Sequence, residues 1–284
     1  MKHLTTGVNC ATLTPMDSDG AACIPLLAAH CRWLLAQGCA NVVLLGTTGE
    51  ANSFSLEERK AILEDLLETG LEPQRLIVGT GCCAIDDTVT LTRHALRCGV
   101  DRVLVLPPFY YKNIEDAGLI EAFAKTIDAV GDGRLRLYLY QIPQLTGVAF
   151  SAAVIESLLH AYPAIIAGIK DSSGDWEGIR ALCFQFGKRM DVLAGSERFL
   201  IAALRAGATG CVTATANAHP AMIAQLYERR GEADAEAEQA RVTAARAAFE
   251  RLPVIAALKE ATARRTGDER WRNLRPPLLP LPLA

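Results

Sequence analysis

Eight short apolar runs, separated by polar turns and amphipathic stretches, constrain the fold of this chain more than any other feature. The runs are mostly continuous and rich in valine, isoleucine and leucine, as expected for strands that are buried on both faces. They are CATLTPM (10–16), ANVVLLG (40–46), RLIVGTG (75–81), RVLVLPP (102–108), RLRLYLYQIP (134–143), AIIAGIKDS (164–172), MDVLAGSE (190–197) and GCVTATAN (210–217). Strands alternating with helices form a parallel sheet, and their regular spacing over about 215 residues favours closure into a (β/α)8 barrel of the α/β class.

Helix signals lie between the apolar runs. In SLEERKAILEDLLETG (55–70), Ser55 is a candidate N-cap, Glu58 follows three residues later as a capping box requires, and Gly70 closes the helix. The strand pattern stops after Asn217, and the remainder reads as helices followed by a proline-rich end. We therefore predict a catalytic barrel over residues 1–220 and a C-terminal helical extension over residues 221–284 that packs on it.

Composition excludes several classes of function. The formal charge of −3 over 284 residues gives no electrostatic reason to expect nucleic-acid or anionic-membrane binding. No apolar run approaches the roughly 20 residues that span a bilayer, and the N-terminus lacks the hydrophobic region of a signal peptide. The nine cysteines are scattered without a CxxC pair, which favours reduced thiols and a cytoplasmic location.

The ends of the apolar runs carry the candidate chemistry, because (β/α)8 enzymes place their active sites at the C-terminal ends of the strands. Lys170 ends the run AIIAGIK, where its side chain has little room to reach water. Burial favours the neutral amine, and a neutral amine can attack a carbonyl to form a Schiff base. An ion pair with Asp171 or another carboxylate at the barrel mouth is the structural alternative.

Two other strand ends complement that lysine. In Gly46-Thr47-Thr48-Gly49 the glycines allow close approach of a ligand, and the threonine amides can point at an anion such as a carboxylate. Tyr140 on the fifth run is spaced to face Lys170 on the sixth, where a phenol can relay a proton. A tight turn and a core tyrosine are the ordinary alternatives. No two of the five histidines are spaced like zinc ligands, so we expect no metal site.

The strand-end motifs together resemble the dihydrodipicolinate synthase and N-acetylneuraminate lyase superfamily of class I pyruvate-dependent aldolases, from about Thr5 to about Arg265. The matching segments are GTTGE (46–50), PPFYY (107–111), YQIPQLTG (140–147), GIKDSSGD (168–175) and GSE with GATGCVTATAN (195–217). Each segment is weak alone, but their order and strand placement make the resemblance specific.

The resemblance implies a role for each matching residue. Lys170 would form the imine with a 2-keto acid, so no cofactor is needed beyond this covalent link. Tyr140 would transfer protons, while Thr47 and Thr48 would bind the pyruvate carboxylate, with a threonine hydroxyl linked to Tyr140. Tyr111 would complete this relay across a subunit interface, which implies a homotetramer built from tight dimers.

Departures from the family pattern bear on the second substrate. The synthase branch has an arginine two residues after the proline of its YNxP motif, where this chain has Leu145. A leucine lacks the charge-assisted hydrogen bonds to a semialdehyde carboxylate, a loss of about 1.5–3 kcal/mol. In the lyase branch, two acids and a serine bind sugar hydroxyls. Here Glu197 can serve as one acid, Arg198 replaces the other and Ala214 replaces the serine.

The substrate-contacting set that we predict therefore extends beyond the lysine. Ser172 can substitute for the lyase threonine, Gly195 and Glu197 end the seventh run, and Arg198 can hold a distal anionic group. We predict a lyase that cleaves a 2-keto-3-deoxy sugar acid or condenses pyruvate, or a related dehydratase. The alternatives are a 4-hydroxy-tetrahydrodipicolinate (dihydrodipicolinate) synthase, which joins pyruvate to aspartate semialdehyde, and a non-catalytic keto-acid-binding paralogue.

Overall fold

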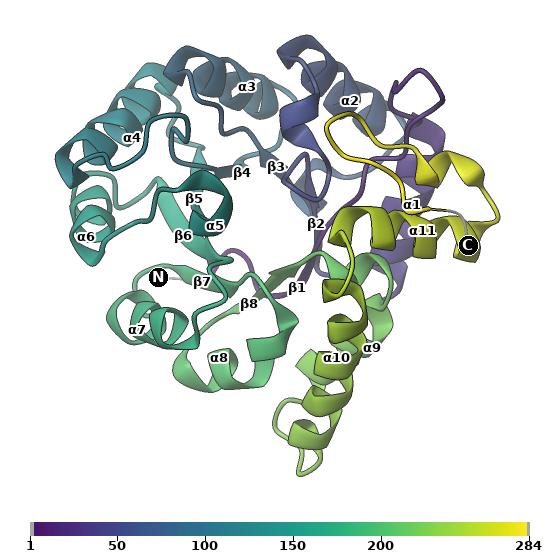
Figure 1. Cartoon of the computed structure of the whole chain (residues 1–284). Helices are drawn as coiled ribbons and strands as arrows, with labels where there is room; N and C mark the ends of the chain where they lie inside the picture. The colour runs from purple at the N-terminus through teal and green to yellow at the C-terminus, as the bar shows by residue number, and fades with distance from the viewer. Residues whose placement is uncertain (1–2, 283–284) are drawn as a thin grey trace.

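Eight parallel strands close into a barrel in the computed structural model, which describes residues 3–282 (Figure 1). Neighbours in sequence pair in space, and the first strand closes the ring by pairing with the last. The predicted TIM-barrel fold is thus confirmed. The strands are β1 (Gly7–Ala11), β2 (Asn41–Leu44), β3 (Leu76–Gly79), β4 (Arg102–Val105), β5 (Arg136–Gln141), β6 (Ile166–Asp171), β7 (Asp191–Ala194) and β8 (Gly210–Thr213).

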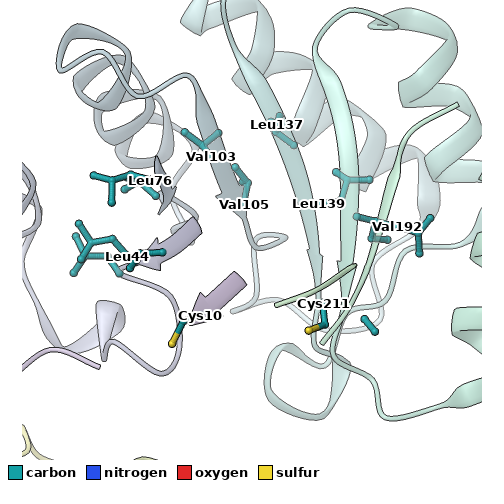
Figure 2. Close-up of a cluster of buried hydrophobic side chains, with 14 of the residues drawn as sticks. Cys10, Leu44, Leu76, Val103, Val105, Leu137, Leu139, Val192 and Cys211 are labelled. Atoms are coloured by element: carbon teal, nitrogen blue, oxygen red, sulfur yellow. The ribbon is translucent and has the colours of Figure 1, made fainter. Parts of the chain in front are cut away.

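Side chains alternate between the two faces of these strands. Val43 packs inside the barrel with residues such as Ile77 and Leu104, while Val42 and Leu44 pack outward against the helices. Figure 2 shows part of this outer layer, in which Cys10, Leu44, Leu76, Val103, Val105, Leu137, Leu139, Val192 and Cys211 lie between barrel and helices. Both faces are apolar, which explains the continuous apolar runs in the sequence.

Helices follow the strands and surround the barrel (Figure 1). In α2 the predicted capping box is present, because Ser55 accepts from the Glu58 amide and Glu58 accepts from the Ser55 amide. No helix among residues 3–282 is long and apolar enough to cross a membrane. The helices are α1 (Ile24–Ala36), α2 (Leu56–Glu68), α3 (Ile85–Arg97), α4 (Asp116–Val130), α5 (Pro143–Thr146), α6 (Ala152–Ala161), α7 (Trp176–Phe186), α8 (Leu200–Ala206), α9 (Pro220–Glu228), α10 (Ala235–Glu250) and α11 (Val254–Thr266).

The first and last strands differ from their predicted bounds. β1 lies over Gly7–Ala11 instead of residues 10–16, and β8 ends at Thr213, before the short 3-10 helix η4 (Thr215–Asn217). The two strands pair from Gly7 with Gly210 to Cys10 with Thr213, so both leave the barrel at one level. Leu13, beyond that level, is buried against the C-terminal helices. An apolar run can therefore continue past a strand when another element covers it.

The chain after β8 wraps part of the barrel. α9 contacts β1, whereas α10 contacts α8, α9 and α11, and it also contacts the short 3-10 helix η3 (Glu197–Phe199) after β7. This packing brings α10 to the C-terminal ends of β7 and β8. The division of the chain into a domain of residues 1–220 and an extension of residues 221–284 stays a prediction.

Candidate active site

Lys170 and Tyr140 are direct neighbours in the barrel. They pair across β6 and β5, and Lys170 Nζ lies 4.0 Å from the centroid of the Tyr140 ring. The alternation of the two strands turns both side chains to the inside, as the spacing in the sequence predicts. Each is only 3–4% exposed.

Lys170 has no carboxylate partner within ion-pair distance among residues 3–282. The alternative partner, Asp171, instead accepts hydrogen bonds from Gln141 Nε2 at 2.8 Å and from the Ser173 amide at 2.7 Å. β6 is buried along its whole length, and Lys170, near its end, lines a cavity. The lysine nitrogen is therefore placed to meet a ligand.

The hydroxyl of Tyr140 joins this lysine to the turn after β2. Thr47 Oγ1 lies 3.2 Å from the Tyr140 hydroxyl oxygen. Burial raises the pKa of Tyr140, but the charge of Lys170 and hydrogen-bond donors on Thr47, Lys170 and Ser172 together lower it below the ordinary tyrosine value. A phenol whose pKa is lowered toward the working pH gives up its proton more readily, which suits proton transfer.

The turn that carries Thr47 and Thr48 is held in an unusual backbone conformation. Leu45 and Glu50, at either side of it, have left-handed φ angles of 54° and 57°. Such angles are uncommon for residues other than glycine and persist where surroundings enforce them. Buried contacts hold Glu50 in this conformation. Its carboxylate accepts a hydrogen bond from the Arg275 amide at 3.1 Å and forms an ion pair with Lys259.

These residues surround a cavity of about 250 Å3 at the C-terminal end of the barrel. Seven of the ten residues predicted to act at the site line it: Thr47, Thr48, Tyr140, Lys170, Ser172, Gly195 and Arg198. Gly195 is a required glycine, because a Cβ there would overlap the Ser172 hydroxyl and lie 2.6 Å from the Asp171 backbone oxygen. Ala11, Ile142, Val212 and Ala214 also line the cavity, so its wall is partly apolar.

The other three predicted residues lie outside the cavity. Glu197 is 1% exposed and lies beneath the cavity wall. Tyr111 and Leu145 are 73% and 62% exposed on the surface of the single chain, and Tyr110 beside Tyr111 is equally exposed. Leu145 lies on α5 and does not line the cavity, so it makes no wall of the site within the single chain.

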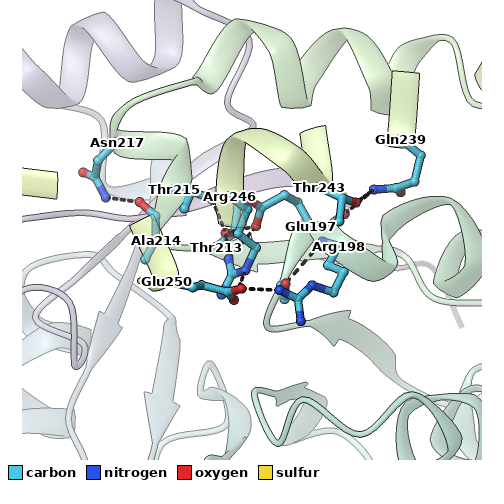
Figure 3. A network of polar contacts seen from close by, with 11 residues as sticks. Glu197, Arg198, Thr213, Ala214, Thr215, Asn217, Gln239, Thr243, Arg246 and Glu250 are labelled. Atoms are coloured by element: carbon cyan, nitrogen blue, oxygen red, sulfur yellow. Dashed lines mark hydrogen bonds and ion pairs between the residues drawn. The ribbon is translucent and has the colours of Figure 1, made fainter. Parts of the chain in front are cut away.

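The outer wall of the cavity contains two residues that the sequence did not single out, Arg246 and Glu250 of α10 (Figure 3). Arg246 Nη1 donates to Glu197 Oε2 at 2.8 Å, and its Nε donates to Glu250 Oε1 at 2.8 Å. Arg198 also pairs with Glu250. Buried Glu197 accepts further hydrogen bonds from the hydroxyls of Thr213 and Thr215.

A separate cluster of potential metal ligands lies between α2 and α3. Glu64, His94 and Cys98 bring their ligand atoms within 4.8 Å of one another. His94 Nε2 lies 2.7 Å from Glu64 Oε1 and 3.7 Å from Cys98 Sγ, so one nitrogen serves both contacts. A hydrogen bond between buried His94 and exposed Glu64 accounts for this arrangement. All nine cysteines are free thiols.

Known proteins match the chain over nearly its whole length. The model of the dihydrodipicolinate synthetase family matches residues 4–283. An uncharacterized DapA-like lyase of Chloroflexus aurantiacus is 38% identical over 277 residues, which cover 97% of this chain and 91% of that protein.

Two solved structures share the fold closely. Dihydrodipicolinate synthase from Agrobacterium tumefaciens is 32% identical, with a TM-score of 0.88 over 98% of this chain and 94% of that one. YagE, a prophage protein of the dihydrodipicolinic acid synthase family from E. coli K12, was solved in complex with pyruvate. It is 27% identical, with a TM-score of 0.90 over 98% and 94% of the two chains. The chain therefore belongs to the dihydrodipicolinate synthetase family.

Proposed function

We propose that the protein is a class I aldolase or lyase that forms an imine between Lys170 and pyruvate or a 2-keto-3-deoxy sugar acid, and breaks or makes a carbon–carbon bond. The observation that carries the proposal is a buried lysine without an ion-pair partner, 4.0 Å from the ring of Tyr140, in a cavity that also contains Thr47 and Thr48. The pyruvate bound to the relative YagE supports a 2-keto acid as the ligand.

In this reaction the neutral amine of Lys170 attacks C2 of the 2-keto acid, and Tyr140 supplies the proton with which water leaves the carbinolamine. The amides and hydroxyls of Thr47 and Thr48 hold the carboxylate. The C4 hydroxyl then loses its proton, the C3–C4 bond breaks, and its electron pair moves into an enamine with the iminium nitrogen as acceptor. An aldehyde leaves, C3 takes up a proton, and water hydrolyses the imine to release pyruvate and Lys170.

The synthase reaction is the second candidate, in which pyruvate condenses with aspartate semialdehyde. The relative from Agrobacterium tumefaciens carries that name, which keeps this candidate open. Against it stands Leu145, which is 62% exposed and cannot bind the semialdehyde carboxylate. A carbon–oxygen lyase that removes water from the same imine is chemically close. A non-catalytic binder is the weakest candidate, since binding alone does not need a buried amine beside a phenol.

We also propose that the protein forms a homotetramer. Tyr110 and Tyr111 stack edge to face on the loop before α4 and are more than 70% exposed in the single chain. An exposed aromatic pair of this kind favours a protein interface. A homotetramer of tight dimers would bring Tyr111 of one subunit toward the Tyr140 relay of its partner. Nine free thiols are compatible with a cytoplasmic location.

Reduction with borohydride in the presence of pyruvate tests the proposal. Mass spectrometry of peptides is expected to find an adduct of pyruvate mass on Lys170, and Lys170→Arg abolishes it because a guanidinium does not form the imine. Lys188→Arg, at an exposed lysine, is the matched control and retains the adduct. A wild-type protein that gives no adduct at saturating pyruvate contradicts the proposal.

A further inference from the structure

The charged side chains in the outer wall of the cavity form a network of ion pairs and hydrogen bonds. Glu197, which is 1% exposed, pairs with Arg246, and Glu250 pairs with both Arg246 and Arg198 (Figure 3). Arg246 itself is 15% exposed in its side chain. The amide of Gln239, also on α10, donates to the Glu197 backbone oxygen at 2.9 Å, so the helix is fixed against η3.

Arg246 keeps hydrogen-bonding capacity after these contacts. Its Nε donates to Glu250, and its Nη1 donates to Glu197 and, at 3.3 Å, to Thr213 Oγ1. No atom among residues 3–282 accepts a hydrogen bond from its Nη2. Because the guanidinium is planar and held at two of its nitrogens, the two N–H groups of the third have a fixed direction. Arg246 also lines the cavity, so these two N–H groups are the donors that we assign to a ligand there.

The charges of the network balance. The carboxylates of Glu197 and Glu250 offset the guanidinium groups of Arg246 and Arg198, so the outer wall has no excess positive charge for a distal carboxylate or phosphate. Glu250 also lines the cavity and is an acceptor only, which repels an anionic group and attracts a hydroxyl donor. N–H donors beside a carboxylate acceptor match a chain of hydroxyl groups, each of which donates and accepts.

We propose that Arg246 and Glu250 of α10, together with Arg198, select substrates in which the chain beyond the 2-keto acid is uncharged and hydroxylated. The inference rests on the proposed function, because it assumes that the keto acid is bound at Lys170. It differs from the expectation that Arg198 holds a distal anion: the carboxylate that Arg198 meets is Glu250 of the same chain. The acceptor in the condensation direction is accordingly a neutral hydroxyaldehyde.

Three aldehydes test the selection in condensation with pyruvate. D-Glyceraldehyde is neutral and hydroxylated, D-glyceraldehyde 3-phosphate adds an anion, and butanal has neither charge nor hydroxyl. We expect kcat/KM for glyceraldehyde to exceed the values for the other two aldehydes by roughly tenfold or more. The phosphate is repelled by the like charge of Glu250. Butanal leaves the donors of Arg246 without an acceptor. A rate with glyceraldehyde equal to or below that of either other aldehyde overturns the inference.

Variants assign the selection to α10. Glu250→Gln removes the charge and keeps the shape, and is expected to raise the ratio of kcat/KM for the phosphate over glyceraldehyde severalfold. Arg246→Lys keeps a cation beside Glu197 but loses the planar donors, and is expected to lower the ratio for glyceraldehyde over butanal severalfold. Glu236→Gln breaks the exposed ion pair with Arg205 elsewhere on α10 and leaves both ratios unchanged. If both ratios of kcat/KM stay at the wild-type values in Glu250→Gln and Arg246→Lys, the selection does not depend on α10.

Trapping of pyruvate on Lys170 is measured for each protein in the same series. If the wild-type protein traps pyruvate but prefers the phosphorylated aldehyde, this inference is wrong and the proposed function stands. If the wild-type protein traps no pyruvate, both this inference and the proposed function are wrong. The wild-type comparison needs no variant, so poor folding of Glu250→Gln or Arg246→Lys does not prevent the test.

Discussion

Lys259 of α11 and Glu50 of the turn after β2 form an ion pair in which both side chains are 0% exposed, with Nζ 2.5 Å from Oε1. Lys259 Nζ also donates to the Asn273 backbone oxygen at 2.5 Å. Burial lowers the pKa of Lys259, and the nearby Glu50 carboxylate opposes that effect. Through Glu50 the C-terminal helices hold the turn that carries Thr47 and Thr48.

The first prediction concerns this buried pair. Lys259→Met is expected to lower the free energy of unfolding by about 3–5 kcal/mol, because it leaves the Glu50 carboxylate buried without its cation. Urea denaturation followed by circular dichroism measures the change. The KM for pyruvate should rise as well, since the turn loses its anchor.

Two further proteins make this prediction specific. In the double variant Glu50→Gln with Lys259→Met, the stranded charge is gone, and part of the lost stability should return. Lys60→Met breaks a surface pair with Glu57, whose side chain is 83% exposed, and is expected to cost less than about 1 kcal/mol. A Lys259→Met protein as stable as Lys60→Met would show that the pair does not anchor the turn.

The second prediction separates the hydroxyl of Tyr140 from its ring. Tyr140→Phe keeps the ring beside Lys170 but removes the hydroxyl that we propose transfers protons, so kcat should fall by about 10²–10⁴. Steady-state kinetics measure it. Tyr138→Phe is the matched control two residues away on β5. Its hydroxyl bonds to Asp191 and Thr5 at the opposite end of the barrel, and its loss should lower stability and leave kcat unchanged.

The third prediction is a pH dependence. The pKa of Tyr140 lies below its ordinary value, so the protonated phenol, which we propose acts as the acid, is lost at a lower pH than that of an unperturbed tyrosine near 10. The alkaline limb of the kcat profile should therefore lie below that pH. Thr47→Val removes one donor to the phenolate, raises the pKa of Tyr140 and moves this limb to higher pH. A limb that stays fixed in Thr47→Val would assign it to another group.

The sequence predicts some parts of the site better than others. Lys170 and Tyr140 could be placed because strand periodicity and barrel order decide which residues end strands and which strands are neighbours. Arg246 and Glu250 could not. α10 carries two arginines and three glutamates at irregular spacing, and its packing on η3 and α8 decides which of them reach the cavity.

The same limit applies to the buried acid. The resemblance to the lyase branch makes Glu197 a predicted substrate contact, as one of the acids at the end of the seventh run. In the structure it turns under the wall and accepts from Thr213, Thr215 and Arg246. Which way a side chain turns after the last paired residue depends on donors from distant segments, and a local motif does not record them.

The fourth prediction uses the ion pair between Glu58 and Arg275, which joins the capping box of α2 to the C-terminal tail. The hydrogen bonds from Arg275, followed by those of the cap, lower the pKa of Glu58 from 4.5 to about 2. A carboxyl with a depressed folded pKa adds stability above its unfolded pKa and loses that stability as pH falls toward its folded pKa. Between pH 4.5 and about 2 the wild type should therefore lose more stability than Arg275→Met, as measured by urea denaturation at several pH values. Parallel losses in the two proteins would contradict the linkage.

The last prediction tests the assembly through Tyr111. Its side chain is 73% exposed, so it has no part in the cavity of an isolated chain. If the partner subunit receives it, Tyr111→Phe should lower kcat by removing one hydroxyl from the relay, while Tyr110→Phe, at a neighbour just as exposed, should not. Sedimentation velocity is expected to give a tetramer for the wild type and both variants, because the ring that packs at the interface is retained. A monomer with full activity, or equal kcat values for the two variants, would restrict the relay to Tyr140 and Thr47 of one chain.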